Sequence, residues 1–334
     1  MRYTTLPGTS LRVSVIAMGS WALAGDMAWG DQSEQDSLEA TRAAVDVGIN
    51  FFDTAPGYGD GLSEKRLGKG LDGLRHKVVI ATKIGPDSMR QAAVVASVER
   101  SLANLNTDYI DLIQIHWPSR EVPLEETLGA LDALKQAGKV RAIGVSNFGK
   151  QDITQSLATA GVGKPVTNQL PYSLLSRSIE YDVVPACKAG GVGILCYSPL
   201  LWGLLAGTYA KADDVPDGRA RSRHFSSTRK LTRHKEAGCE HETFRALDQI
   251  RGLAERVGVS MSDLAVAWLL HQPMVSAVLT GIRRPQQAVA NSRAAGIELD
   301  AATQEELLRV TEPIKAALGN NPDLWQSGDS SRFR

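Results

Sequence analysis

This sequence is poor in cysteine, and the scarcity excludes two ways of holding a protein together. Its 334 residues include three cysteines, Cys187, Cys196 and Cys239. So small and odd a number cannot form a disulfide framework, and their spacing matches no zinc motif. Cys196 lies within an apolar run, as a buried core thiol does. The cysteine content therefore predicts reduced thiols and a cytoplasmic protein.

The chain also lacks an excess of charge and a long apolar segment. Lys plus Arg and Asp plus Glu each number 37, so the formal net charge is zero. General binding to nucleic acid or to an acidic membrane needs a net basic surface, which this composition does not provide. No apolar run reaches the length of about eighteen residues expected of a membrane span, and no signal-peptide region is evident. We expect a soluble protein with neither nucleic-acid nor membrane partners.

Several catalytic motifs are missing as well. The sequence has no P-loop, no G-x-S-x-G elbow and no H-E-x-x-H pair. Residues 68–73 spell G-x-G-x-x-G, but they follow a helical run and precede a strand, the reverse of a dinucleotide-binding turn. His234 and His241 flank Cys239 without a further ligand, and His116 is the lone histidine at a strand end. We interpret the glycines as a helix end and expect no metal site.

What the sequence does contain is a regular alternation of short apolar runs and segments of helical period. Runs that predict strands occur at residues 15–18, 51–53, 78–82, 110–116, 142–146, 166–170, 193–197 and 277–280. Helical patterns occur at 35–47, 92–105, 124–136, 151–160, 181–189 and 244–257. Such alternation predicts parallel strands with right-handed crossovers, and eight units close into a barrel. A doubly wound sheet also alternates, but no glycine-rich phosphate turn follows the first strand. We predict an α/β fold, a (β/α)8 TIM barrel, in a single domain over residues 1–334.

Three segments depart from this repeat. Residues 1–14 contain a turn between two extended runs, which predicts a β-hairpin at the bottom of the barrel. Residues 206–243 form a long irregular loop rich in Arg and Lys. This loop is either a solvated surface segment or a mobile cationic flap over a phosphorylated ligand. Residues 318–334 form a C-terminal tail that either folds over the barrel mouth or is a disordered end.

Ionisable side chains follow three consecutive predicted strands. Asp53 and Tyr58 follow the second strand, Lys83 the third and His116 the fourth. The carboxyl ends of barrel strands meet at one rim, so we expect these four groups to converge. A Lys⁺ beside Tyr58 would lower the phenol pKa from its usual value near 10, with Asp53 orienting Lys83 and His116 binding a substrate oxygen. A phenol that protonates a developing alkoxide is a general acid for carbonyl reduction. The hydride must then come from a nicotinamide cofactor, because no side chain can supply it.

With these motifs the chain resembles the aldo-keto reductases over about residues 1–300, especially the branch with bacterial general-stress, inositol-type and potassium-channel β-subunit-like members. The motifs that carry the likeness are Asp53-Thr54-Ala55 with Tyr58, Thr82-Lys83, Asp111-Leu112 with His116, Gly144-Val145-Ser146-Asn147-Phe148, Asn168-Gln169, Tyr197-Ser198-Pro199-Leu200 with Gly203, and Gly281 with Arg283, Gln287 and Asn291. The resemblance implies a TIM barrel and reversible NAD(P)H-dependent reduction of aldehydes, ketones or sugars to alcohols.

The resemblance also implies a role for each matching residue. Tyr58 would donate the proton, assisted by Lys83 and Asp53, with His116 orienting the carbonyl. The residues implied in cofactor binding are Ser20, Trp21, Ser146, Asn147, Gln169, Tyr197, Ser198, Pro199, Leu200, Gly203, Gly281, Arg283, Gln287 and Asn291. Among them, Ser146, Asn147 and Gln169 would hold the carboxamide, and Tyr197 would stack on the nicotinamide ring.

Two positions depart from the family pattern. Thr208 stands where many relatives have Lys, and Ala290 stands where an acidic residue is usual, which weakens the expected hold on the cofactor. Arg283 and Arg284 still favour a 2′-phosphate, since guanidinium pairs bidentately with phosphate. We therefore expect NADPH/NADP+ rather than NADH.

Other interpretations stay open at this point. The chain also resembles potassium-channel β subunits, which would make it a redox-sensing regulatory subunit with slow turnover. Lys83 could instead form a Schiff base, as in barrel aldolases. Trp21, Trp117 and Trp202 follow strands and would shape an apolar substrate pocket, or merely pack. The sequence predicts a small-molecule carbonyl or alcohol substrate, but neither its identity nor the oligomeric state.

Overall fold

The barrel predicted from the sequence is present and closed. A computed structural model describes residues 1–25, 29–159 and 163–334. Eight parallel strands hydrogen-bond in the cyclic order β10-β3-β4-β5-β6-β7-β8-β9. They are β3 (Ile16–Gly19), β4 (Phe51–Asp53), β5 (Val79–Ile84), β6 (Ile110–Ile115), β7 (Val140–Ser146), β8 (Thr167–Pro171), β9 (Gly193–Tyr197) and β10 (Val275–Gly281). The predicted strands match these to within two residues at each end.

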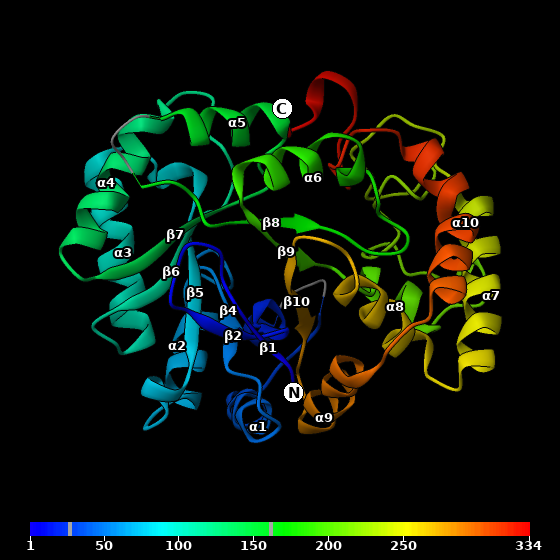
Figure 1. Cartoon of the computed structure of the whole chain (residues 1–334), viewed down its shortest axis with the longest axis horizontal. Coiled ribbons are helices and arrows are strands. Elements are labelled where there is room, and N and C mark those ends of the chain that lie inside the picture. Colours follow the sequence, from blue (N-terminus) through cyan, green and yellow to red (C-terminus); the bar gives the residue numbers. More distant parts are fainter. Residues whose placement is uncertain (26–28, 160–162) are drawn as a thin grey trace.

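Helices form the outer layer of the barrel (Figure 1). They are α1 (Glu34–Asp46), α2 (Leu62–Gly70), α3 (Gln91–Leu105), α4 (Leu124–Gln136), α5 (Lys150–Ala158), α6 (Ile179–Gly190), α7 (Glu240–Val257), α8 (Met261–Leu270), α9 (Pro285–Arg293) and α10 (Ala301–Leu318). Helices α7 and α10 lie side by side on one flank, where α7 precedes α8 in the crossover to β10 and α10 follows α9.

Burial on both faces explains why the strands read as continuous apolar runs. Every residue of β5 and β6 is buried, as parallel strands between two covering layers must be. One apolar cluster fills the barrel interior and includes Ala17, Phe51, Val79, Leu112 and Leu195. A second, larger cluster lies between strands and helices. These two apolar cores, one inside the barrel and one around it, therefore fix the strands whose ends form the rim.

The predicted N-terminal hairpin is also confirmed. Strands β1 (Tyr3–Thr5) and β2 (Arg12–Ser14) pair antiparallel. Leu6, Leu11 and Val13 are buried in the same cluster as the barrel interior. The hairpin thus closes the amino-terminal end of the barrel, opposite the rim that carries the ionisable residues.

The glycine-rich segment, the end of α5 and the cysteines each have a sequence expectation to compare with the structure. The G-x-G-x-x-G letters fall at the end of α2, which stops at Gly70, with Gly73 at φ +76° in the loop that follows. Helix α5 ends at Ala158, and the predicted end at Ala160 lies outside the described residues. All three cysteines are free thiols and buried. Among the helices described, none is long and apolar enough to cross a lipid bilayer.

The irregular loop predicted at residues 206–243 ends at Cys239, because α7 begins at Glu240, and it packs against the C-terminal tail. The backbone N–H of Arg223 donates to the Leu324 carbonyl at 2.8 Å. The buried Arg223 guanidinium donates to the carbonyls of Leu318 and Asn321, both at 2.7 Å, and to both carboxylate oxygens of Glu236. Trp325 and Arg332 of the tail line the cavity at the barrel mouth. The C label lies beside α5 in Figure 1.

Candidate active site

A cavity of about 610 Å³ opens at the carboxyl ends of the barrel strands. Most residues predicted for catalysis, cofactor binding or the substrate pocket line it. They are Ser20, Trp21, Asp53, Tyr58, His116, Trp117, Ser146, Asn147, Gln169, Tyr197, Ser198, Pro199, Leu200, Trp202, Gly203, Gly281, Arg283 and Gln287. Lys83 and Asn291 are the two predicted residues outside this lining.

The strand pleat explains how the polar groups reach the cavity floor. Side chains two apart on a strand face the same side. Asp53 is therefore the next inward position after Phe51, just as Gln114 follows Leu112 and Tyr197 follows Leu195. The apolar interior of the barrel passes directly into a polar layer at its carboxyl end.

Beneath the floor, Lys83 and Asp53 form a buried ion pair. Lys83 Nζ donates to Asp53 Oδ1 at 2.5 Å and to the Thr54 carbonyl at 2.9 Å. The second oxygen, Oδ2, accepts from Gln169 Nε2 at 2.8 Å and from Gln114 Nε2 at 3.0 Å. The carboxylate thus accepts three hydrogen bonds, as a buried charge requires.

Tyr58 lies above this pair, between two rings. Lys83 Nζ is 5.2 Å from the centre of the Tyr58 ring. Trp21 stacks on Tyr58 with ring centres 5.9 Å apart, and His116 meets it edge-on at 6.0 Å. The four groups that the sequence places at strand ends do converge on one rim.

The electrostatics differ in one respect from the sequence expectation. Burial raises the pKa of Tyr58 above 10, and the positive charge of Lys83 offsets this only in part, so the pKa is not lowered. Burial alone would lower the pKa of Lys83, but Asp53 reverses that effect and raises it. Near neutral pH the phenol therefore keeps its proton and the amine keeps its charge.

His116 is neutral at physiological pH. Burial, followed by the positive charges of Lys83 and Arg332, lowers the pKa of His116 to about 3. A neutral imidazole can donate one N–H to an oxygen in the cavity without adding charge there. This form suits the binding of a carbonyl oxygen.

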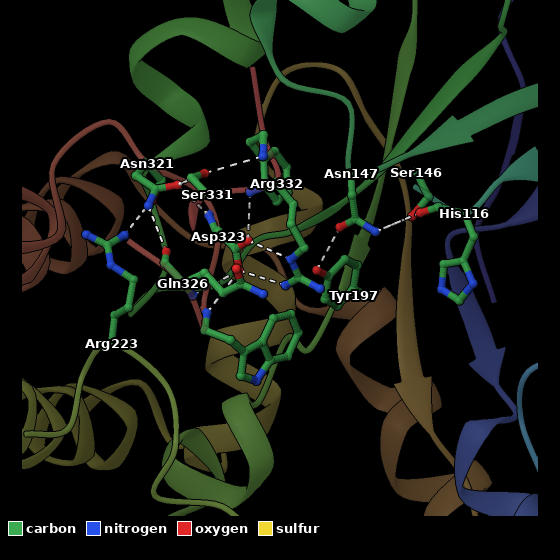
Figure 2. Close-up of polar contacts among 12 residues, drawn as sticks. His116, Ser146, Asn147, Tyr197, Arg223, Asn321, Asp323, Gln326, Ser331 and Arg332 are labelled. Carbon is green, nitrogen blue, oxygen red and sulfur yellow. Dashed lines mark hydrogen bonds and ion pairs between the residues drawn. The ribbon is translucent and has the colours of Figure 1, made fainter. Parts of the chain in front are cut away.

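Ser146, Asn147, Gln169 and Tyr197 form a connected polar wall. Ser146 Oγ donates to the Gln169 carbonyl at 3.0 Å, and Asn147 Nδ2 donates to the His116 carbonyl at 3.0 Å. Tyr197 donates its hydroxyl to Asn147 Oδ1 at 2.9 Å, as Figure 2 shows. Asn147 has φ +61°, an uncommon conformation that these bonds support.

The segment after β9 is a tightly turned part of the lining. Ser198, Leu201 and Trp202 all have positive φ, at +54°, +40° and +52°. Such conformations cost of order 1–3 kcal/mol each and cluster at functional sites. Trp202 packs on Trp325 of the tail with ring centres 5.7 Å apart.

At the far end of the cavity, the predicted phosphate arginines already have partners. The Arg283 guanidinium donates to the carbonyls of Trp29 and Asp31 and to Gln32 Oε1. Arg284 pairs with Asp36, so its charge is partly neutralised. Asn291 lies on α9 outside the cavity lining and donates to the Gly281 carbonyl.

Gln114 and Trp29 are among the residues that sequence reasoning did not assign to this site. Gln114 was not assigned a role, although an amide inside the apolar strand β6 was a usable signal. Trp29 was also missed. From the loop and the tail, the lining receives Arg219, Arg221, Leu231, Arg233, Trp325 and Arg332. Loop 206–243 is thus part of the cavity wall rather than only a solvated segment.

Within the part of the chain that the structure describes, no three His, Cys, Asp or Glu side chains are placed to hold a metal ion. His234 Nε2 lies 3.2 Å from the Ser222 carbonyl, and the Cys239 thiol lies 3.7 Å from Thr243 Oγ1. These two side chains have structural partners of their own.

The chain is similar to known proteins over most of its length. The model of the Aldo/keto reductase family matches residues 15–312. The chain is 38% identical to aldo-keto reductase YhdN of Bacillus subtilis, covering 93% of this chain and 94% of the relative. It is 33% identical to the NADH-specific methylglyoxal reductase of Escherichia coli, covering 94% and 100%. It is 31% identical to a probable voltage-gated potassium channel subunit beta of Oryza sativa, covering 98% and 99%.

Solved structures share the fold. A glycerol dehydrogenase from Gluconobacter oxydans superposes with a TM-score of 0.81 at 32% identity, covering 96% of this chain and 97% of that one. An aldo/keto reductase from Klebsiella pneumoniae, in complex with NADP and acetate, gives a TM-score of 0.74 at 30% identity, covering 93% and 96%.

Proposed function

The chain belongs to the aldo/keto reductase family, and on this premise we propose that it is a cytoplasmic NADP-dependent oxidoreductase. It reversibly reduces aldehydes or ketones, sugars included, to alcohols. The observation that carries the proposal is the placement of Tyr58 and His116 on a cavity floor directly above the buried Asp53–Lys83 pair. The bound nicotinamide supplies the hydride.

Each residue of the floor has one task in this reaction. Tyr58 holds a proton near neutrality and gives it to the oxygen that becomes the alcohol. Lys83 stabilises the phenolate that remains, and Asp53 keeps Lys83 charged and in place. Neutral His116 donates an N–H to the same substrate oxygen and so orients the carbonyl.

The cavity suits an extended dinucleotide. Ser146, Asn147 and Gln169 present amide and hydroxyl groups to a carboxamide, and Tyr197 presents a ring for stacking. Arg219 and Arg221 bring positive charge from the loop to a diphosphate. These observations support the flap interpretation of loop 206–243 as a phosphate-binding wall.

NADPH is the preferred cofactor in this proposal, although one relative is named as NADH-specific. The support is the cationic lining, whose loop arginines Arg219, Arg221 and Arg233 favour a cofactor that carries an additional phosphate. Titration of intrinsic fluorescence with each cofactor tests it. A dissociation constant for NADH equal to or below that for NADPH would overturn the preference.

The experiment that tests the reaction is Tyr58→Phe, assayed against aldoses, inositols, aliphatic aldehydes and aryl aldehydes. We expect loss of turnover with NADPH binding retained, because the ring still packs between Trp21 and His116. Turnover that survives the substitution would disprove the role of Tyr58.

A regulatory role is the second candidate, and one observation favours it. The similarity to the rice channel subunit extends over 98% of this chain. A subunit of that kind would bind NADPH tightly and turn over slowly with every carbonyl. Steady-state kinetics on the wild-type protein separate the two functions.

The Schiff-base alternative for Lys83 finds no support in the geometry. A lysine nucleophile must be neutral and accessible. The Lys83 side chain is 0% exposed, and its pKa is raised. Borohydride trapping with a carbonyl substrate should leave Lys83 unmodified.

A further inference from the structure

The C-terminal tail places a guanidinium at the substrate end of the cavity. Arg332 lines the same cavity as Tyr58 and His116. Its guanidinium carbon lies 3.7 Å from the centre of the Trp117 ring, and Phe333 packs edge-on against that ring at 5.7 Å. Because Trp117 directly follows His116 in the chain, this charge lies beside the floor of the site.

Asp323 fixes the orientation of this guanidinium. The Asp323 side chain is 0% exposed and accepts from Arg332 Nε and Nη2, both at 2.8 Å. This side-on pair occupies one edge of the guanidinium. The other edge of the Arg332 guanidinium carries the second N–H of Nη2 and the N–H groups of Nη1. Among the described residues, none forms a hydrogen bond with Nη1. Figure 2 shows Arg332 held by Asp323 on the side of the cavity that carries Tyr197.

The surrounding charges leave an anion-binding environment. Among the described lining residues, Asp53 is the one acidic side chain, and it is committed to Lys83 and two glutamines. His116 is neutral, and the charge of Arg332 is one cause of its lowered pKa. Arg332 is therefore within electrostatic reach of the group expected to bind the carbonyl oxygen.

We propose that Arg332 is a specificity-determining residue that binds an anionic group, a carboxylate or a phosphate, on the carbonyl substrate. Two parallel N–H groups on the open edge of a guanidinium match two oxygens of such a group. Asp323 and Trp117 hold the guanidinium in advance, so little side-chain freedom is lost on binding. This inference rests on the proposed function and names its substrate class.

The test compares substrates that differ only in charge. Wild-type protein and Arg332→Gln are assayed with 2-, 3- and 4-carboxybenzaldehyde, their carboxamide counterparts and 4-formylphenyl phosphate. We expect Arg332→Gln to lower the carboxylate-to-carboxamide ratio of kcat/KM about tenfold or more for the best isomer. Arg332→Lys should restore part of the ratio. Comparison of 4-formylphenyl phosphate with 4-carboxybenzaldehyde shows whether a phosphate or a carboxylate is preferred.

A matched control and a binding measurement complete the test. Arg309→Gln, on the exposed face of α10, changes the net charge equally and should leave the ratio as in wild type. Binding of benzoate and of benzamide to the protein with NADP+ present is also measured by tryptophan fluorescence. We expect Arg332→Gln to weaken the binding of benzoate but not that of benzamide. The proposal would be overturned if Arg332→Gln lowered kcat/KM or binding equally for charged and neutral compounds, or if it weakened NADP+ binding. If no carbonyl is reduced by the wild type, the proposed function itself fails, whereas reduction of neutral aldehydes without preference for anions rejects only Arg332.

Discussion

The floor of the cavity and its outer wall are held in place by different kinds of structure, the floor by neighbouring strands of one sheet and the wall by side chains that join loop and tail. On the floor, Lys83 and Gln114 are register partners on β5 and β6, and Lys83 reaches Asp53 on the neighbouring strand β4, 30 residues away. In the wall, Arg223 bonds a carbonyl 98 residues away, and Arg120 bonds the Arg332 carbonyl across 212 residues.

This difference in construction predicts a difference in function. Sheet register positions the floor, so its geometry is shared with the barrel and changes only if the barrel does. A few side chains that join loop 206–243 and tail 318–334 position the wall. Substitutions in the floor should therefore affect the chemical step, and substitutions in the wall should affect local stability and substrate binding.

The largest effect is expected for Lys83→Met. Removing the ammonium leaves no charge to stabilise the phenolate of Tyr58, so kcat should fall about 10²–10⁴-fold. It also leaves the buried Asp53 without its partner ion, which should lower the free energy of unfolding by about 3 kcal/mol. Stopped-flow kinetics and urea unfolding measure the two losses. The exposed Lys65→Met on α2 is the control, and a nearly unchanged kcat in Lys83→Met would show that the floor does not tune Tyr58.

A smaller effect, confined to the wall, is expected for Arg223→Met. The substitution leaves Glu236 and the carbonyls of Leu318 and Asn321 without their donor, at a cost of about 2–4 kcal/mol. Proteolysis should begin within 206–243 or 318–334 while the barrel stays protected. Arg245→Met, on the exposed face of α7, serves as the control. Uniform loss of protection across the chain would mean that wall and floor unfold together.

The fold could be predicted from the sequence because its signals are local. Each barrel strand is a short apolar run, since both of its faces are covered. Helix α8 was missed because it is buried almost all round, so it has no polar face that marks its period. The rim position of Asp53 and Lys83 followed from strand ends in the same way.

The rest of the site could not be predicted because no local pattern encodes it. Arg332 meets Trp117 only because the tail returns to the barrel mouth. The sequence left two interpretations for that tail, and a charge count cannot choose between them. The pKa of Tyr58 was also misjudged, because the extent of burial depends on Trp21 and His116 packing around the ring.

A modest effect on the wall alone is expected for Gly149→Ala. A Cβ at Gly149 would lie 2.0 Å from the backbone oxygen of Arg334, which accepts from the Gln151 N–H at 2.8 Å at the start of α5. The backbone at Arg334 must move, and KM should rise about threefold to tenfold while kcat and the dissociation constant of NADPH change little. Gly252→Ala on α7 meets nothing within 4 Å and is the matched control. An unchanged KM would show that the wall does not depend on the position of Arg334 against α5.

The smallest effect is expected from pH, and it concerns the floor. His116 has a pKa of about 3, so it stays neutral from pH 8 down to pH 5, and kcat/KM should show no step near the ordinary histidine pKa of 6.5.

The free energy of unfolding, in contrast, should depend on pH over this range. Below pH 6.5, His116 is protonated in the unfolded chain but stays neutral in the folded protein. The free energy of unfolding therefore falls as the pH drops from 6.5 towards 3. His224, with a pKa of about 4, acts in the same direction. Urea unfolding at pH 7 and pH 5 should therefore show a smaller acid loss in His116→Gln than in wild type. A kinetic step near 6.5 that disappears in this variant would mean that His116 titrates freely and that the floor is more open to water than its packing indicates.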